Sequence, residues 1–326
     1  MPPGIEAHTD ILYQPLTTSA LDTDPQWGLY DGSGALLDAG AYYRGPGQAP
    51  VGQSLQRPWP AVVAVADSTV LIYGGVIVDH FGHFLLTSLA RLWPVLMLPG
   101  DRSAIRILFH GAGDPAQWWA VPYIAACFSA LGLVPANIVH FPVPTRIPQL
   151  VVPRPAFEEH NFVHRAYVAL TRTIGAGLTK PSLRRCGPVY MARTRYPRIT
   201  QGFVNEQELV DRLATLGIAI VYPEDLSFAA HVDLFQTASV VLGPISSTFH
   251  PAVFARTCCP LLLLSPNHIV NPNFAMVDQI GGLSAEYFFV DPGRLDDDGA
   301  GRVTHRYVIR DVASLAADIV GRLRLC

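Results

Sequence analysis

The sequence predicts an α/β protein with two Rossmann-like domains that face a cleft. From about residue 105 onward, short apolar runs alternate with amphipathic segments of helix length, a pattern typical of parallel sheets covered by helices. The chain has 326 residues, of which 50% are hydrophobic and 15% are charged, so it can form two cores. Ligands of such sheets bind beyond the carboxyl ends of the strands.

The first domain is expected to span residues 1–183. Up to about residue 66 the chain is rich in Gly and Pro, which predicts irregular structure with small strands. A strand-like run at 69–78 then leads into a helix-like run at 84–96. The later elements expected in this domain are strands at 105–110, 137–141 and 149–152 and helices at 117–131 and 164–178.

The second domain is expected to span residues 184–326. The polar, basic segment 179–188 contains prolines and is the best linker candidate. An amphipathic C-terminal helix at 311–326 closes the chain and is a candidate to pack back on the first domain. The other expected elements are strands at 188–193, 218–223, 240–244, 260–265 and 286–291 and helices at 205–217, 227–239 and 251–257.

Charge and composition exclude several classes of protein. A net charge of -3 and a pI near 6.4 argue against a broad nucleic-acid surface, which needs clustered Lys and Arg. Five cysteines without metal-ligand spacing predict buried thiols in a reducing compartment. The N-terminus lacks the pattern of a signal peptide, and the apolar windows are too short to span a bilayer. The expected location is the cytoplasm, with peripheral association at the inner face of the membrane left open.

The first candidate site is the basic loop after the strand at 188–193. Arg193, Arg195 and Arg198 lie within six residues and bring several guanidinium groups to the end of a buried strand. Guanidinium groups bind phosphate oxygens with matching geometry, so this loop is a candidate anion site. The alternative is a solvated loop whose arginines pair with surface carboxylates.

The second candidate site is the stretch 242–254. A strand ends at Gly243-Pro244, and the hydroxyl residues Ser246, Ser247 and Thr248 precede a helix. Free N–H groups at a helix start, together with these hydroxyls, can hold a phosphate group. Ordinary capping of a core helix by Ser or Thr explains the same pattern and is favoured on this stretch alone.

The third candidate site is the sequence DHFGHF, which contains Asp79, His80 and His83. A metal pair at these histidines is conceivable, but a third ligand is not evident nearby and a metal site needs at least three. A histidine oriented by a neighbouring carboxylate can act as a general base on a hydroxyl group. A histidine that supports the core or caps the helix fits the spacing equally well.

Missing motifs narrow the chemistry further. The sequence contains no G-x-G-x-x-G, no G-x-x-x-x-G-K-[ST], no G-x-S-x-G and no H-E-x-x-H. This weakens the usual dinucleotide, nucleoside-triphosphatase, esterase and zinc-protease assignments. No D-x-D stands in a convincing metal-loop context, so the sequence predicts no metal-bridged diphosphate site and no bound metal.

Three stretches, 82–96, 189–217 and 221–254, resemble glycosyltransferase family 61, which includes bacterial capsular-polysaccharide proteins. The resemblance implies a GT-B-like fold in which the second domain holds the donor nucleotide and the first holds the acceptor. It implies an inverting transfer, without metal or other cofactor, from a nucleotide sugar, most readily a UDP-sugar. The implied acceptor is an oligosaccharide or glycolipid used in surface polysaccharide synthesis.

The same resemblance implies roles for the candidate residues. Arg193 and Arg198, with Ser246 to Thr248, neutralise the donor diphosphate, and Glu224 lies at the rim of the nucleotide pocket. His83, or Asp79 alone or through it, deprotonates the acceptor hydroxyl. Arg195 and Asn205 complete the donor set, and His80 completes the catalytic set.

One departure from the family pattern keeps other functions open. Relatives usually carry Gly-Pro-His-Gly-Ser, whereas this chain has Ile245, Ser246 and Ser247 after Gly243-Pro244, and His250 is the candidate substitute for the lost histidine. A catalytically silent nucleotide-sugar or glycan-binding module is therefore the main alternative. A metal-dependent hydrolase that uses His80 and His83 is the third hypothesis.

Overall fold

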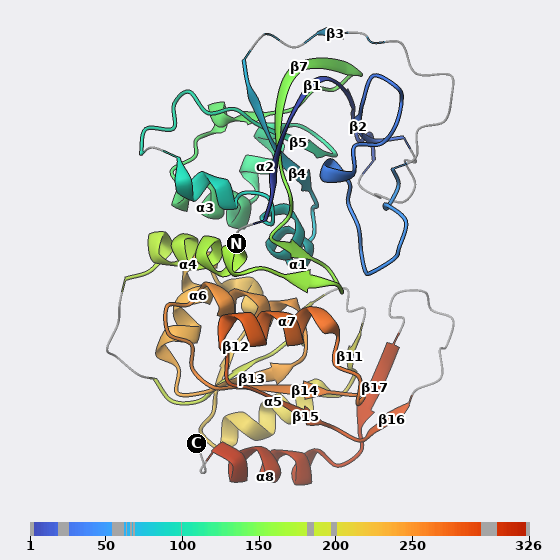
Figure 1. Cartoon of the computed structure of the whole chain (residues 1–326). Helices are drawn as coiled ribbons and strands as arrows, with labels where there is room; N and C mark the ends of the chain where they lie inside the picture. Colours follow the sequence, from blue (N-terminus) through green and yellow to red (C-terminus); the bar gives the residue numbers. More distant parts are fainter. Residues whose placement is uncertain are drawn as a thin grey trace. The chain divides into compact units, whose positions relative to one another are not determined.

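The computed structural model of the protein contains two compact units, residues 1–177 and 178–326 (Figure 1). Both units mix strands and helices, which confirms the predicted α/β class. The GT-B-like arrangement of the units and the boundary after residue 183 stay predictions. No helix in the described part of the chain is long and apolar enough to cross a membrane. The structure describes residues 3–18, 26–53, 62, 64–65, 67, 69–98, 100–180, 186–196, 201–294 and 305–323.

The first unit is built on a seven-stranded sheet with the order β2-β1-β7-β4-β5-β6, in which β3 pairs with β7. Its parallel part, β6-β5-β4-β7, has the order of a Rossmann half, and a small β8-β9 hairpin follows β7. The strands are β1 (Ile5–Gln14), β2 (Gly28–Tyr30), β3 (Ala64–Val65), β4 (Leu71–Ile77), β5 (Ile107–Gly111), β6 (Ile138–Val139), β7 (Thr145–Pro153), β8 (Phe157–Glu158) and β9 (Phe162–Val163).

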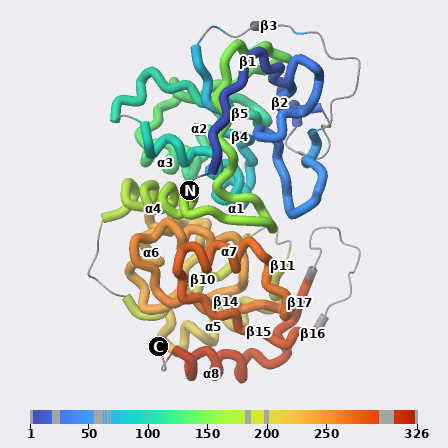
Figure 2. Tube along the Cα trace, viewed as in Figure 1, coloured from blue at the N-terminus to red at the C-terminus, as the bar shows by residue number. Residues whose placement is uncertain are grey.

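Strand β1 corrects the expectation of irregular structure with small strands near the N-terminus. It is ten residues long and pairs antiparallel with β7 from Ile5 opposite Pro153 to Tyr13 opposite Thr145. Figure 2 shows these two distant segments side by side. Its buried residues Ile11 and Tyr13 belong to the core of the first unit, so tertiary packing decides its conformation.

Two of the three helices expected in the first unit are divided into shorter elements, whereas the helix expected at 164–178 is confirmed. The expected helix at 84–96 is wrong as one continuous element, since a π-helical turn and a separate 3-10 helix that contains Pro94 replace it. The expected helix at 117–131 is divided before Pro122, which disfavours helical backbone at Val121. The helices are η1 (Asp38–Gly40), α1 (Phe81–His83), η2 (Phe84–Ser88), η3 (Trp93–Met97), α2 (Pro115–Ala120), α3 (Pro122–Ala130), η4 (Pro135–Asn137) and α4 (Arg165–Leu178).

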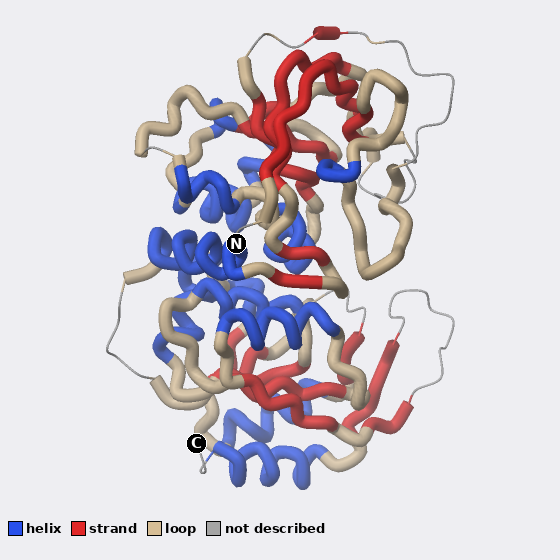
Figure 3. The backbone as a smooth tube through the Cα atoms, viewed as in Figure 1, coloured by secondary structure: helices blue, strands red, loops and turns tan. Residues whose placement is uncertain are grey.

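The second unit contains a five-stranded parallel sheet with the order β12-β10-β13-β14-β15. Helices α5 and α8 cover one face of this sheet and α6 and α7 cover the other (Figures 1 and 3). A second sheet has the order β11-β17-β16. The strands are β10 (Val189–Met191), β11 (Gln201–Phe203), β12 (Ala219–Val221), β13 (Val241–Pro244), β14 (Leu261–Ser265), β15 (Ala285–Phe289), β16 (Pro292–Arg294) and β17 (His305–Ile309).

Apart from an unpredicted 3-10 turn at Pro223–Asp225, the helices of the second unit follow the predicted order with two exceptions. The helix expected at 251–257 is instead a 3-10 helix with Pro251 inside it. Helix α7 was not predicted, although Asn271 caps its start and Gly282, in the left-handed region, ends it. The helices are α5 (Glu206–Thr215), η5 (Pro223–Asp225), α6 (Phe228–Thr237), η6 (Ser247–Phe254), α7 (Pro272–Gly281) and α8 (Val312–Leu323).

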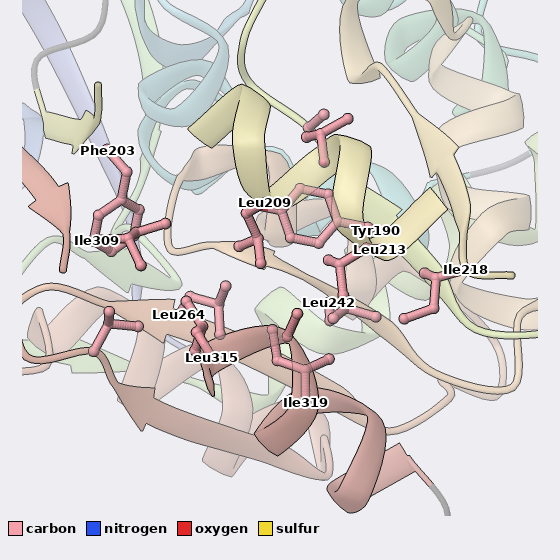
Figure 4. Close-up of a cluster of buried hydrophobic side chains, with 14 of the residues drawn as sticks. Tyr190, Phe203, Leu209, Leu213, Ile218, Leu242, Leu264, Ile309, Leu315 and Ile319 are labelled. Atoms are coloured by element: carbon pink, nitrogen blue, oxygen red, sulfur yellow. The ribbon is translucent and has the colours of Figure 1, made fainter. Parts of the chain in front are cut away.

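The core of the second unit lies between its sheet and helices α5 and α8 (Figure 4). Strands contribute Tyr190 and Leu242, and α5 contributes Leu209. Leu315 and Ile319 of α8 pack into this same core, so the apolar face of the C-terminal helix is buried within the second unit.

Each unit has one point where the direction of its strand order reverses. In the first unit the chain steps from β4 outward to β5 and β6 and then crosses back to β7, so the reversal lies between β4 and β7. In the second unit it lies between β10 and β13. Because ligands of open α/β sheets bind at the carboxyl ends of the strands beside such a reversal, these two places are the natural locations for sites.

Candidate functional site

The first cluster forms where β4 and β7 end. After β4 the chain passes through Asp79 and His80 and enters α1, whose last residue is His83. Glu159 directly follows β8, the first strand after β7. Nδ1 of His83 lies 2.8 Å from Oε1 of Glu159, so the reversal point brings together two residues that are far apart in sequence.

The side chain of Glu159 is only 1% exposed, and several hydrogen-bond donors surround its carboxylate. Thr87 donates to Oε1 at 2.6 Å and the Tyr42 hydroxyl at 3.2 Å, while Nη2 of Arg44 lies 3.1 Å from Oε2. Burial alone would raise the pKa of Glu159, but these hydrogen bonds and the charges of His83 and Arg44 lower it to about 2. Glu159 is therefore ionised at neutral pH.

The ionised state of Glu159 fixes the tautomer of His83. A carboxylate only accepts hydrogen bonds, so the proton in this contact is carried by Nδ1 of His83. In the neutral ring Nε2 is then left as an acceptor. The His83 side chain is 32% exposed, so a small molecule can reach the ring. This arrangement can remove a proton from a hydroxyl group.

Asp79 and His80 lie in the loop before His83, and neither is the carboxylate or ring that binds Nδ1 of His83. The rings of His80 and His83 are 4.9 Å apart between centroids. Partial burial of His80 lowers its pKa, and the nearby His83 lowers it further. Asp79 precedes α1 and has an exposed side chain, and the carboxylate that binds His83 is that of Glu159. Glu159 was not predicted as a site residue, and its only local signal in the sequence is a Glu-Glu-His run after an apolar strand.

A cavity of about 390 Å³ opens beside this loop, at the carboxyl ends of β4 and β5. The β4 side contributes Asp79, and the β5 side contributes Ala112. Helices α2 and α3 complete the wall with Gln117, Trp118 and Ile124. The cavity lies wholly within the first unit.

The second cluster forms where β10 and β13 end. Arg193 follows β10, and Ser246 follows β13. The two strands approach so closely that a Cβ atom at Gly243 would meet the carbonyl oxygen of Met191 at 2.6 Å. Glycine at this position therefore allows the strand pairing that places the two loops side by side.

Arg193 is fixed by contacts on both its backbone and its side chain. Its N–H donates to Oε1 of Glu206 at 2.9 Å, and its Nη1 donates to the carbonyl of Gln201 at 3.0 Å. Burial lowers the pKa of Arg193. Glu206 also accepts from the Tyr190 hydroxyl at 3.2 Å, and burial raises its pKa. Glu206, like Glu159, was not predicted as a site residue.

The hydroxyl residues predicted to bind phosphate start the 3-10 helix η6. The Ser246 and Thr248 hydroxyls bind one another at 2.7 Å, and Ser247 is the first helical residue. His250 is buried and its ring lies 4.7 Å from that of Phe274. The loop after β13 therefore brings hydroxyl groups and the N-terminus of η6 to the same edge of the sheet as Arg193.

The other predicted donor residues have different surroundings. Arg195 lies 3.4 Å from the centroid of the Tyr222 ring and pairs with Asp225 at 2.8 Å, as a solvated arginine would. Glu224 is exposed in η5. The side chain of Asn205 accepts from the N–H of Ile309 at 2.9 Å and donates to its carbonyl at 3.0 Å, which joins α5 to β17.

Two further predictions concern Arg198 and metals. Arg198 lies outside the described residues. Within the described parts of the chain, no group of three or more His, Cys, Asp or Glu side chains is placed to hold a metal ion.

Comparison with protein families identified a match. The family model described as Glycosyltransferase 61 matches residues 81–262, a range that contains His83, Glu159, Arg193 and Ser246. No curated protein matches the chain.

Proposed function

The chain belongs to glycosyltransferase family 61, and from this premise we propose that it transfers a sugar from a nucleotide-sugar donor, most readily a UDP-sugar. The acceptor is a hydroxyl group of an oligosaccharide or glycolipid used to build a surface polysaccharide. Transfer inverts the configuration of the anomeric carbon and uses no metal ion. The first unit supplies the catalytic base and the second unit binds the donor.

The observation that carries this proposal is the contact between His83 and Glu159. Nε2 of His83 takes the proton of the acceptor hydroxyl, and the charge of Glu159 stabilises the imidazolium that forms. The acceptor oxygen bonds to the anomeric carbon as the bond from that carbon to the diphosphate oxygen breaks. Attack from the face opposite the leaving group inverts the carbon.

Arg193 and the hydroxyl-rich start of η6 support the assignment of the donor site. A departing nucleoside diphosphate gains negative charge in the transition state, which a fixed cation and hydrogen-bond donors stabilise. Arg193 keeps its orientation through Gln201 and Glu206, and the loop that begins at Ser246 lies at the end of the neighbouring strand. Arg198, Glu224 and His250 complete the proposed donor set, whereas Arg195 is paired with Asp225 and the side chain of Asn205 is bound to Ile309.

A calorimetric titration tests the donor site. Purified protein is titrated with UDP, GDP, CDP and their common sugar conjugates, each with and without EDTA. We expect one nucleotide to bind, with unchanged affinity in EDTA and at least about tenfold weaker binding by Arg193→Ala, because one charge-assisted contact to phosphate contributes roughly 1.5–3 kcal/mol. Arg212→Ala, at an exposed position of α5, is the matched control. No binding across the panel would refute the donor site.

A catalytically silent nucleotide-sugar-binding module is the second candidate. It is favoured by Ile245, Ser246 and Ser247, which stand where relatives usually carry His-Gly-Ser. Such a module binds the nucleotide in the same titration but releases none from the sugar donor in the presence of glycan acceptors. Measured release that depends on His83 would exclude it.

A further inference from the structure

We propose that the cavity beside Asp79 binds an apolar aglycone of the acceptor, an alkyl or aryl group carried next to the hydroxyl that reacts at His83. This inference rests on the proposed function, because it takes the first unit as the acceptor-binding unit. It adds the chemical class of the acceptor, which is a glycoside of an apolar alcohol rather than a free sugar.

The position of the cavity ties it to the His83 loop. Asp79 lines the cavity and lies only four residues before His83, the last residue of α1. Phe81 of α1 packs edge-on against Tyr123 of α3, with ring centroids 5.2 Å apart. Val121, two residues before Tyr123, and Ile124, directly after it, line the cavity. The loop that carries the candidate base therefore contributes Asp79 to the cavity wall and packs, through Phe81, against the helix that contributes Ile124.

The lining of the cavity is mostly apolar. Ile77, Trp118 and Ile124 are buried side chains in its wall. The indole N–H of Trp118 donates to the carbonyl of Ala112 at 2.7 Å, and Oε1 of Gln117 accepts from the N–H of Asp114 at 3.0 Å. A sugar ring needs several free polar partners to replace its bound water, and this wall offers few. An apolar group loses no hydrogen bonds on entering it.

The size and the polar rim of the cavity fit this ligand class. A volume of about 390 Å³ is within the range of small-molecule pockets, roughly 300–1,000 Å³. The carboxylate of Asp79 is exposed and accepts hydrogen bonds, so it suits the sugar hydroxyls at the junction between aglycone and glycan. The apolar part enters the cavity while the sugar stays at its mouth.

A comparison of alkyl chain lengths tests the inference on the intact protein. Calorimetric titration compares hexyl and methyl β-glycosides of glucose, galactose and mannose. Each buried methylene group is worth roughly a fourfold gain in affinity, so a hexyl glycoside is expected to bind at least about tenfold more tightly than its methyl partner. Equal affinity within every pair would overturn the proposal, and this measurement needs no variant protein.

Replacement of two alanine residues by phenylalanine tests whether the alkyl group binds in this cavity. Ala112→Phe places a large side chain in the cavity wall and is expected to remove the chain-length preference. Ala116→Phe makes the same change at an exposed position of α2 outside the wall and is expected to keep it. Circular dichroism confirms that each variant is folded. A preference that survives in folded Ala112→Phe would place alkyl binding elsewhere and overturn the assignment.

The failure of this inference can be distinguished from the failure of the proposed function. Nucleotide binding that depends on Arg193, with no preference for longer alkyl chains, would refute the aglycone site alone. A chain-length preference removed by Ala112→Phe, in a protein that binds no nucleotide, would refute the glycosyltransferase proposal and leave an apolar ligand site in the first unit.

Discussion

Nδ1 of His83 lies 2.8 Å from Oε1 of Glu159, a residue 76 positions further along the chain. The carboxylate is buried and ionised, and it accepts from Thr87 and Tyr42 as well. Its rigid setting orients the imidazole ring before any substrate arrives. In the proposed reaction, an imidazole held in this way would lose little freedom when it acts as the base, which is the usual advantage of a preorganised site.

Loss of the charge on Glu159 is expected to slow sugar transfer. Glu159→Gln keeps the shape of the side chain but cannot stabilise an imidazolium at His83, so we expect kcat to fall about tenfold or more. His83→Ala removes the base itself and should cost roughly 10²–10⁴-fold. The measurement is nucleotide release from the donor identified by titration. Glu158→Gln is the control, and equal rates for Glu159→Gln and this control would contradict the role of Glu159.

Glu159 also predicts a pH dependence of stability. Its pKa is lowered from 4.5 to about 2 in the folded protein, so its contribution is complete above pH 4.5 and is lost as the pH falls through 2. The shift corresponds to about 3 kcal/mol of unfolding free energy. Urea unfolding at about pH 7 and about pH 3 should show a smaller difference for Glu159→Gln than for the wild type. Parallel losses in both proteins would argue that other groups dominate.

For Glu206 we expect the opposite pH dependence of stability. Burial raises its folded pKa above 4.5, so ionisation of Glu206 costs stability as the pH rises through the folded value. Glu206→Gln keeps an acceptor for the Arg193 N–H and the Tyr190 hydroxyl and removes the buried charge. This variant should be at least as stable as the wild type at about pH 8, with the gain disappearing below pH 4.5.

The Glu206→Ala variant provides the contrast. It leaves the Arg193 N–H and the Tyr190 hydroxyl without this acceptor, which costs about 1–3 kcal/mol for each buried group. Urea denaturation of both variants, at both pH values, measures the two effects. A Gln variant as unstable as the Ala variant would show that the charge of Glu206, and not its hydrogen bonds, supports the loop.

Gly243→Ala should destabilise the second unit. The added Cβ would meet the Met191 carbonyl oxygen at 2.6 Å, and the backbone of β10 must move to relieve the contact. We expect a loss of roughly 1–3 kcal/mol in unfolding free energy and weaker nucleotide binding, because Arg193 and Ser246 follow these two strands. Gly187→Ala is the control, since nothing lies within 4 Å of its added Cβ. Equal melting temperatures for the two variants would contradict this account.

The sequence predicted the second unit better than the first. Strands β10, β12, β13 and β14 and helices α5, α6 and α8 all lie inside their expected ranges. These elements carry their own signals, such as the apolar run of β14 and the Ser227 cap of α6. In the first unit, β1 depends on a partner strand that begins at Thr145, and no local pattern reveals such a pairing.

The same distinction applies to the candidate sites. The DHFGHF run indicates His83 as a candidate base, but the carboxylate that the same run offers as its partner is Asp79. Glu159 reaches His83 only because β7 lies beside β4 in the sheet, and that neighbourhood is a property of the strand order. Glu206 was overlooked for a different reason, since a glutamate at a helix start is ordinarily solvated.

The reversal points of the strand order affect how this protein can evolve. Each cluster is assembled from loops of one sheet, and the two compact units meet in sequence at residues 177 and 178. A recombination event that exchanged residues 178–326 with those of a relative would replace Arg193 and Ser246 together and leave the His83–Glu159 pair untouched. Under the proposed function, donor preference and acceptor preference would therefore be inherited from different ancestors, with one crossover between them.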